Sequence, residues 1–302
     1  MNDIHKSAWF PGAVIFVGAA LWGLYWLPLR YIEAAGLNGL WSIFAINIVP
    51  LVALFPLAFH RRKIIQREAA AIAIIGLMTG LGLVCYSIGL IYTSIMRATL
   101  LFYLTPIWST LFAFLILKER AGWQRWAAIA VGFAGLFLML SAGGSSANPL
   151  NVGDLAGFMS GVFWGFGATG LRRWPHIGPS DSVPSQYLFG TLVTLLAIAI
   201  AGTSAGQVPA IGVFWEALPA IIFFYVLLVV PSLFAIFWAA QRVSPGRTGI
   251  LMMSEVIVAG ISAPLLAGEY LSRPEMLGAA LIVAAGLIEV LGPAQTGEKS
   301  AA

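Results

Sequence analysis

Long continuous stretches of apolar residues fill most of the chain, and polar residues gather in the short intervals between them. A helix that crosses a bilayer needs about 20 mainly apolar residues. Ten stretches meet this requirement, at residues 11–31, 38–59, 69–92, 94–117, 122–141, 153–172, 182–201, 214–240, 244–267 and 273–291. Because they are continuous rather than alternating, they favour membrane helices over a membrane barrel. The pattern therefore predicts an all-α integral membrane protein of ten transmembrane helices.

The composition supports a lipid environment. Of 302 residues, 60% are hydrophobic and 9% are charged, whereas soluble domains carry about 25% charged residues. A soluble fold of this composition would expose large apolar patches and aggregate. The net charge of +4 does not indicate nucleic-acid binding, because the basic residues lie in short clusters between the apolar stretches.

The distribution of those basic residues predicts an orientation. Intervals 60–67, 118–125, 172–173 and 242–247 carry Lys and Arg, whereas intervals 142–152 and 202–213 carry none. Cytoplasmic loops hold an excess of Lys and Arg. The alternation predicts that both termini are cytoplasmic and that the number of spans is even. The small and polar residues 292–302 are expected to form a disordered tail.

An internal repeat relates the two halves of the chain. The pairs at a shift of 150 include Arg97 with Arg247 and Glu119 with Glu269, and the pairs at a shift of 142 are Trp22-Gly23 with Trp164-Gly165 and Arg30 with Arg172. The repeats cover residues 11–141 and 153–291, and each holds five predicted helices. Because five is odd, the halves would lie in the membrane with opposite orientations. Inverted repeats are the architecture of many secondary transporters, with the substrate site near the midplane.

Several short motifs follow one another in an order that resembles the drug/metabolite transporter superfamily, in its EamA-like ten-helix branch. They are Trp22-Gly23 and Trp164-Gly165, the run from Tyr92-Thr93-Ser94 through Leu104-Thr105-Pro106 to Leu117-Lys118-Glu119-Arg120, and Leu266-Ala267-Gly268-Glu269. The resemblance covers residues 11–291 and implies transport across an inner membrane. Within the family the chain is most similar to exporters of aromatic and other neutral amino acids, through Tyr103-Leu104-Thr105-Pro106. The second half departs from the pattern, because Glu255-Val256 stands where the first half has Thr105-Pro106.

Glu255 is the strongest candidate for a functional residue. It lies midway along the stretch 244–267, and an ionisable group at that depth usually faces a cavity or a partner. At helical spacing it shares a face with Thr248, Met252, Ala259 and Ser262. The carboxylate could contact the ammonium group of a substrate or act as a protonatable coupling group. The alternative is a structural carboxyl group, neutral and hydrogen-bonded to a neighbouring helix.

Aromatic and hydroxyl side chains supply the other candidates for the cavity. Tyr86 lies in a stripe of small residues, which fits either a groove with a stacking platform or close helix packing. On the stretch 94–117, one polar track holds Tyr103 and Pro106, a second holds Thr105 beside Trp108, and the sequence does not choose between them. Pro106 is the expected helix break: it frees a backbone carbonyl that must find another partner or line a wet cavity, and the alternative is a simple kink. Further candidates for the cavity wall are Tyr25, Trp164 and Met252.

These features predict a secondary transporter that exports aromatic and other neutral amino acids by alternating access. An exporter of drugs or other small metabolites in the same fold is the alternative, and an intramembrane enzyme or a channel is the alternative of another class. The G-x-S-x-G match at residues 202–206 lacks a histidine partner in its predicted external loop, and the chain has no P-loop or H-E-x-x-H motif. The expected partners are a small-molecule substrate and the bilayer. No cofactor, metal or nucleic acid is expected, and the oligomeric state is left open, with a monomer as one possibility.

Overall fold

The computed structural model describes residues 9–143, 151–262, 265–266 and 272–291, and all regular structure within these residues is helical. The first half contains α1 (Phe10–Trp22), α2 (Trp26–Ala34), α3 (Leu40–His60), α4 (Arg62–Arg67), α5 (Ala69–Tyr92), α6 (Ile95–Phe102), α7 (Thr105–Phe112), the π-helical η2 (Ala113–Leu117) and α8 (Trp123–Gly143). The predicted tail 292–302, the chain before residue 9 and the Gly268-Glu269 motif lie outside the described residues.

The second half begins with α9 (Val152–Arg173) and α10 (Pro179–Ala201). It continues through η3 (Gly202–Ala205), α11 (Ile211–Ile221), the π-helical η4 (Ile222–Val229), α12 (Val230–Ala240), α13 (Pro245–Met252), α14 (Ser254–Ser262) and α15 (Arg273–Leu291). Six segments of the described chain are long and apolar enough to cross a membrane. They are Phe10–Ala34, Leu40–His60, Ala69–Tyr92, Arg97–Leu117, Pro179–Ala205 and Ile211–Ala240.

Three of the predicted helices are interrupted, and only one interruption was expected. The first lies between α1 and α2, where Pro28 has no N–H for the carbonyl four residues earlier. The second, at Tyr103 and Leu104, precedes Pro106 and agrees with the predicted helix break. The third falls at Met253, between α13 and α14, although no proline lies in α14. Tyr103 and Met253 are 150 residues apart, so the second and third breaks occupy equivalent positions of the repeat.

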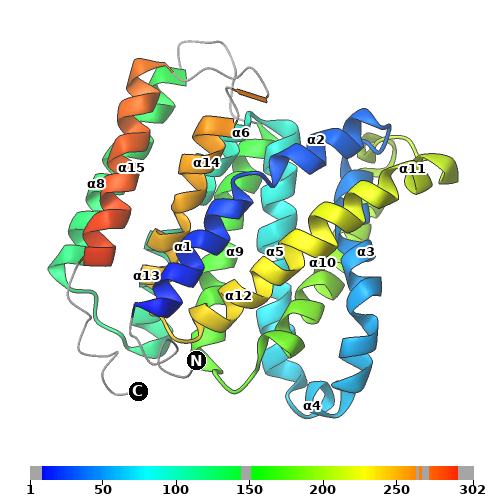
Figure 1. Cartoon of the computed structure of the whole chain (residues 1–302), viewed down its shortest axis with the longest axis horizontal. Helices are drawn as coiled ribbons and strands as arrows, with labels where there is room; N and C mark the ends of the chain where they lie inside the picture. Colours follow the sequence, from blue (N-terminus) through cyan, green and yellow to red (C-terminus); the bar gives the residue numbers. More distant parts are fainter. Residues whose placement is uncertain (1–8, 144–150, 263–264, 267–271, 292–302) are drawn as a thin grey trace.

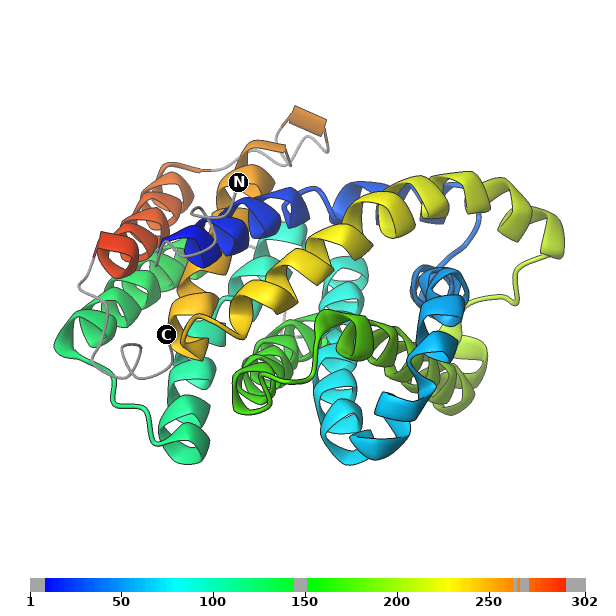
Figure 2. The same ribbon diagram turned by 60° about the horizontal axis from the view of Figure 1, so that its bottom comes forward.

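The helices form two groups around the centre of the molecule (Figures 1 and 2). Helix α9 packs against α5, α6 and α7, and α1 packs against α12, α13 and α14, while α8 and α15 lie side by side at one edge. The repeat converts the first group into the second, because α1 and α9 are equivalent, as are α6–α7 and α13–α14. The first helix of each half therefore packs against helices of the other half.

Glycines allow this close approach. A Cβ added to Gly161 would lie 2.6 Å from the Phe102 carbonyl oxygen. A Cβ on Gly165 would lie 3.0 Å from the Ser109 nitrogen, and one on Gly23 would lie 2.8 Å from the Ala259 nitrogen. The last two contacts are equivalent in the repeat. The glycines of α9 therefore serve close helix packing.

An ion pair fastens the end of α3 to the first turn of α10. Arg61 donates from Nε and Nη2 to the two carboxylate oxygens of Asp181, at 2.8 and 2.7 Å. The Asp181 side chain is fully buried, whereas that of Arg61 is 32% exposed. The hydrogen bonds to Asp181 raise the pKa of the Arg61 guanidinium above its usual value, so the arginine stays charged.

We expect Arg61→Gln to lower the stability of the protein by about 2 kcal/mol, because it leaves a buried carboxylate without its counter-charge and the partly exposed arginine reduces the full cost. Thermal unfolding in detergent measures the change. The double variant Arg61→Gln/Asp181→Asn should be more stable than Arg61→Gln. Arg62→Gln is the matched control, since Arg62 only covers the Phe59 ring and bonds to its exposed carbonyl. Equal unfolding midpoints for Arg61→Gln and Arg62→Gln would contradict the expectation.

Candidate functional site

Glu255 lies in the first turn of α14 and joins the two halves of the chain. Its side chain is fully buried. The Tyr86 hydroxyl donates to Oε1 at 2.6 Å, and the Tyr103 hydroxyl donates to Oε2 at 2.7 Å. Tyr86 comes from α5 and Tyr103 from the break between α6 and α7. Both tyrosines belong to the first half of the chain, so two donors of the first half hold the Glu255 carboxylate of the second half.

Each phenol has a second polar neighbour. The Tyr103 hydroxyl also lies 3.0 Å from the carbonyl oxygen of Met252, at the end of α13. The Tyr86 hydroxyl lies 3.1 Å from Thr99 Oγ1, and the Thr99 hydroxyl donates to the Ile95 carbonyl at 2.7 Å. The site is a small hydrogen-bond network between two helix breaks.

Aromatic rings enclose this network. Tyr86 contacts Phe102 and Tyr25, with ring centroids 5.1 and 6.1 Å apart. Trp22 stacks on Tyr25 at 5.7 Å and lies 5.9 Å from Trp164. All five side chains are almost fully buried. Aromatic faces attract cations that lie over the ring, so the enclosure favours a cationic group beside the carboxylate.

Three further hydrogen bonds position the aromatic side chains. The Trp164 indole donates to the Met252 sulfur at 3.1 Å, and the Trp22 indole donates to the Ser232 hydroxyl at 2.8 Å. The Tyr25 hydroxyl lies 3.1 Å from Ser87 Oγ. These bonds satisfy the polar atoms of the large side chains, which would otherwise carry a desolvation cost.

Cationic side chains stay at the ends of the helices that pack around Glu255. At the start of α9, the Asp154 carboxylate lies 2.8 Å from Arg97 Nε. At the end of α9, Arg172 Nε lies 3.7 Å from the Glu119 carboxylate. Among the ion pairs of the described residues, none includes Glu255. The site therefore presents one carboxyl group, two phenols and aromatic faces.

The structure brings together most of the predicted site residues. Those that meet around the network are Tyr25, Tyr86, Tyr103, Trp164, Met252 and Glu255. Thr105 instead donates to the Phe102 carbonyl, which Pro106 frees from the helix. Trp108 packs edge-on against Phe158 at 5.7 Å, on the face of α7 that meets α9. Of the two polar tracks left open by the sequence, the one with Tyr103 faces the carboxylate.

Phe102 is a site residue that the sequence does not predict, whereas Trp22 is a plausible cavity-wall residue from the sequence, with a membrane-interface tryptophan as the alternative. Phe102 carries no polar atom, so nothing in the sequence separates it from the other phenylalanines that face lipid. Trp22 had a usable signal, since it is the repeat equivalent of Trp164. Arg97, which the repeat pairs with Arg247, bonds to Asp154, and no sequence signal predicts this partner.

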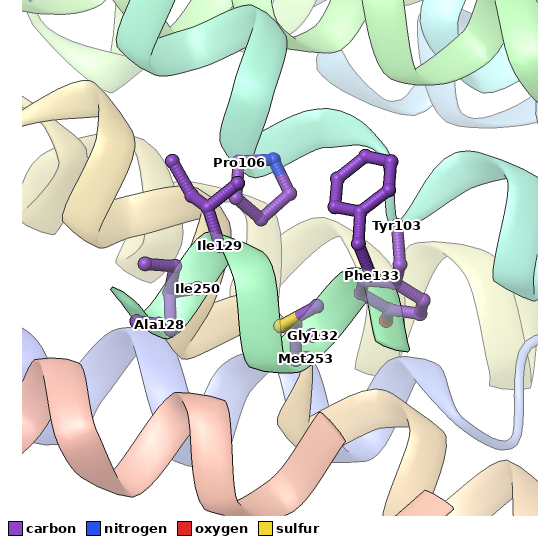
Figure 3. Close-up of a pocket in the computed structure, with 8 residues that line it drawn as sticks. All are labelled: Tyr103, Pro106, Ala128, Ile129, Gly132, Phe133, Ile250 and Met253. Carbon is purple, nitrogen blue, oxygen red and sulfur yellow. The ribbon is translucent and has the colours of Figure 1, made fainter. Parts of the chain in front are cut away.

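A small pocket lies beside the network, between α8 and the two breaks (Figure 3). It is lined by Tyr103, Pro106, Ala128, Ile129, Gly132, Phe133, Ile250 and Met253. Its volume of about 10 Å³ is room for about one water molecule. Tyr103 and Met253, which mark the equivalent breaks, both face this space, so a shift at either break would change its size.

Broken helices that meet around a buried ionisable group, in a chain with several membrane spans, define a membrane transporter. The model of the EamA-like transporter family matches the chain twice, over residues 10–141 and 151–290. The chain belongs to this family. It is a multi-span membrane transporter and not an enzyme.

Curated relatives carry transporter names. An S-adenosylmethionine uptake transporter of Rickettsia bellii is 23% identical over 70% of this chain and 69% of its own length. One of Rickettsia felis is 21% identical over 78% and 77% of the two chains. An uncharacterized inner membrane transporter, YedA of Escherichia coli K12, is 27% identical over 55% and 53%. A solved crystal structure with 19% identity superposes with a TM-score of 0.66 over 94% of this chain and 96% of that chain, which shows the fold.

Proposed function

We propose that this chain is a secondary transporter of the inner membrane that exports aromatic and other neutral amino acids by alternating access. The observation that carries the proposal is the Glu255 carboxylate, enclosed by aromatic rings between two helix breaks. The carboxylate would receive the ammonium group of the amino acid, and the rings of Tyr25 and Trp164 would receive its side chain. Because Glu255 is fully buried, a substrate could reach its carboxylate only after the surrounding helices move apart.

The architecture that we propose has ten transmembrane helices in two inverted repeats, 11–141 and 153–291, with cytoplasmic termini. The double match of the family model supports it, as do the equivalent breaks at Tyr103 and Met253. In Figure 1 the start of α1 and the end of α15 are the lower ends of these helices, and α4 lies at the bottom of the view, which suits a common cytoplasmic side. Two halves of opposite orientation could exchange conformations, so that the site opens first to one side and then to the other.

A second substrate is favoured by the names of the relatives. S-adenosylmethionine carries a sulfonium cation as well as an amino-acid group, and a carboxylate beside aromatic faces suits such a cation. The site offers negative charge without a buried cation among the residues around it, which fits this substrate at least as well as a neutral amino acid. Uptake, as opposed to export, would require only the opposite substrate gradient.

The direct test is counterflow in liposomes that contain the purified protein. Labelled tryptophan, phenylalanine, threonine, methionine and S-adenosylmethionine are offered separately to liposomes loaded with the same unlabelled compound. We expect saturable uptake above protein-free liposomes for at least one amino acid. Uptake of S-adenosylmethionine alone would replace the amino-acid assignment by the second substrate. Uptake of none of the five compounds would refute both assignments and leave the family assignment intact.

A further inference from the structure

The network around Glu255 contains fewer protons than acceptors. Two phenol protons, from Tyr86 and Tyr103, face four acceptors, which are the two carboxylate oxygens, the Met252 carbonyl oxygen and Thr99 Oγ1. Thr99 does not add a proton, because its hydroxyl donates to the Ile95 carbonyl. An ionised carboxylate accepts stronger hydrogen bonds than a neutral carbonyl. When Glu255 is ionised and no substrate is bound, both phenol protons therefore point to the carboxylate.

The Met252 carbonyl oxygen is then left without the Tyr103 proton, and it lies at the helix break in the second half. The N–H of Val256 bonds to the Met253 carbonyl at 3.0 Å, and the Met252 carbonyl faces the Tyr103 hydroxyl. An unpaired buried carbonyl costs about 1–3 kcal/mol. When Glu255 is ionised and no substrate is bound, the Met252 carbonyl at the end of α13 therefore lacks the Tyr103 proton. This cost disappears when the Tyr103 hydroxyl donates to the Met252 carbonyl instead of to Glu255.

We propose that Tyr103 is a positioning residue that couples the occupancy of Glu255 to the helix break at Met253. A proton or a substrate ammonium group on the carboxylate takes over the role of the Tyr103 donor. The released hydroxyl then donates to the Met252 carbonyl and holds α13 against α14 in one geometry. The part of this inference that concerns substrate rests on the proposed function, whereas the part that concerns the proton does not.

Tyr86 provides the matched comparison. It donates to the other carboxylate oxygen at a similar distance, is equally buried, and has Thr99 of its own half as its second neighbour. Tyr86→Phe and Tyr103→Phe therefore each remove one donor from Glu255. Only Tyr103→Phe also removes the contact with the break.

The titratable and charged groups around Glu255 are few. Tyr86 comes from α5, Tyr103 from the α6–α7 break, and Tyr25, which lies against Tyr86, from the α1–α2 break. On the helices that pack against α13 and α14, the charged side chains within the described residues lie near helix ends, and they are Arg97, Asp154, Arg172, Arg173 and Arg273. Arg247 lies in the first turn of α13 itself. Glu255 is the group whose charge changes at the centre of this network.

Hydrogen exchange of the amides of residues 253–258 tests the proton part without any substrate. It is measured in detergent between about pH 5 and pH 8 and corrected for the intrinsic pH dependence of exchange. In the unchanged protein and in Tyr86→Phe, we expect greater protection at the lower pH, where the neutral carboxyl group releases Tyr103. In Tyr103→Phe the difference should vanish. The same pH response in all three proteins would overturn the inference.

Counterflow of whichever compound is transported tests the substrate part. We expect Tyr103→Phe to lower the maximal rate by about fivefold, the factor that one lost hydrogen bond gives. Tyr86→Phe should raise the half-saturation concentration and lower the maximal rate less than Tyr103→Phe does. Equal losses of maximal rate in both variants would overturn the coupling role. Absence of counterflow in the unchanged protein would refute the substrate assignments, and the exchange measurement would still decide the role of Tyr103.

Discussion

Replacement of Glu255 by Gln is expected to reduce counterflow by about tenfold or more and to abolish any response to a pH gradient. Hydrogen bonds to charged groups contribute about 1.5–3 kcal/mol, which corresponds to about 10- to 150-fold in binding. The amide keeps the shape of the side chain and can still accept from the Tyr86 or Tyr103 hydroxyl. It cannot carry the negative charge that receives an ammonium group, and it cannot take up a proton. The fold should survive while transport fails.

The measurement is counterflow at several pH values between about 5 and 8, with and without an imposed pH gradient. Glu216→Gln is the matched control, because Glu216 is an exposed glutamate of α11 and lies outside the network. It should transport at the rate of the unchanged protein. If Glu255→Gln transports as well as Glu216→Gln and keeps the same pH dependence, Glu255 has no role in binding or coupling. The structural interpretation of the carboxyl group would then hold.

Part of this site was visible in the sequence because buried charge is rare in an apolar stretch. Glu255 stands out in residues 244–267 for that reason, and Pro106 marks the break in the first half through covalent chemistry alone. Tyr86 was visible as the one large side chain among small ones. These signals are local, and each follows from the cost of a polar or bulky group at its position.

The remainder depends on contacts between distant residues. No proline marks the break at Met253, and the hydrogen bond beside it joins the Met252 carbonyl to the Tyr103 hydroxyl, 149 residues away along the chain. The same contact decides between the two polar tracks of residues 94–117. Assigning residues to helix faces by their spacing assumes one unbroken helix. The break at Tyr103 and Leu104 changes the direction in which the side chains of α7 point relative to those of α6. Spacing therefore could not place Thr105 and Trp108 relative to Tyr103.

The ten predicted spans show the same limit in another form. Six segments of the described chain meet the length and hydropathy of a membrane span by themselves. Helix α9 carries Asp154, Arg172 and Arg173, and ion pairs join Asp154 to Arg97 and Arg172 to Glu119. A helix surrounded by protein needs less apolar surface than one that faces lipid. The repeat, rather than hydropathy, is the argument for counting it as a span.

Gly23→Ala is expected to destabilise the protein by about 1–3 kcal/mol and to impair transport, because it inserts a methyl group into a closed contact. The added Cβ would lie 2.6 Å from the Glu255 carbonyl oxygen and 2.6 Å from the Val258 Cβ. Backbone dihedrals do not forbid alanine there, since Gly23 has φ −60° and ψ −12°. The cost comes from the neighbour, and relief requires α1 to move away from the first turn of α14. That turn holds the carboxylate between the two phenols.

Two other glycines make the test specific. Gly212→Ala in α11 introduces the same group where no atom lies within 4 Å, so it should be neutral or slightly stabilising. Gly165→Ala is the repeat equivalent of Gly23→Ala, and its Cβ would approach no atom closer than 3.0 Å. Thermal unfolding in detergent should therefore rank Gly23→Ala below Gly165→Ala, and Gly165→Ala below Gly212→Ala. If Gly23→Ala and Gly212→Ala have the same unfolding midpoint, α1 and α14 are not in the close contact that the structure shows at Gly23. If it unfolds early but keeps full counterflow, the position of Glu255 does not depend on that contact.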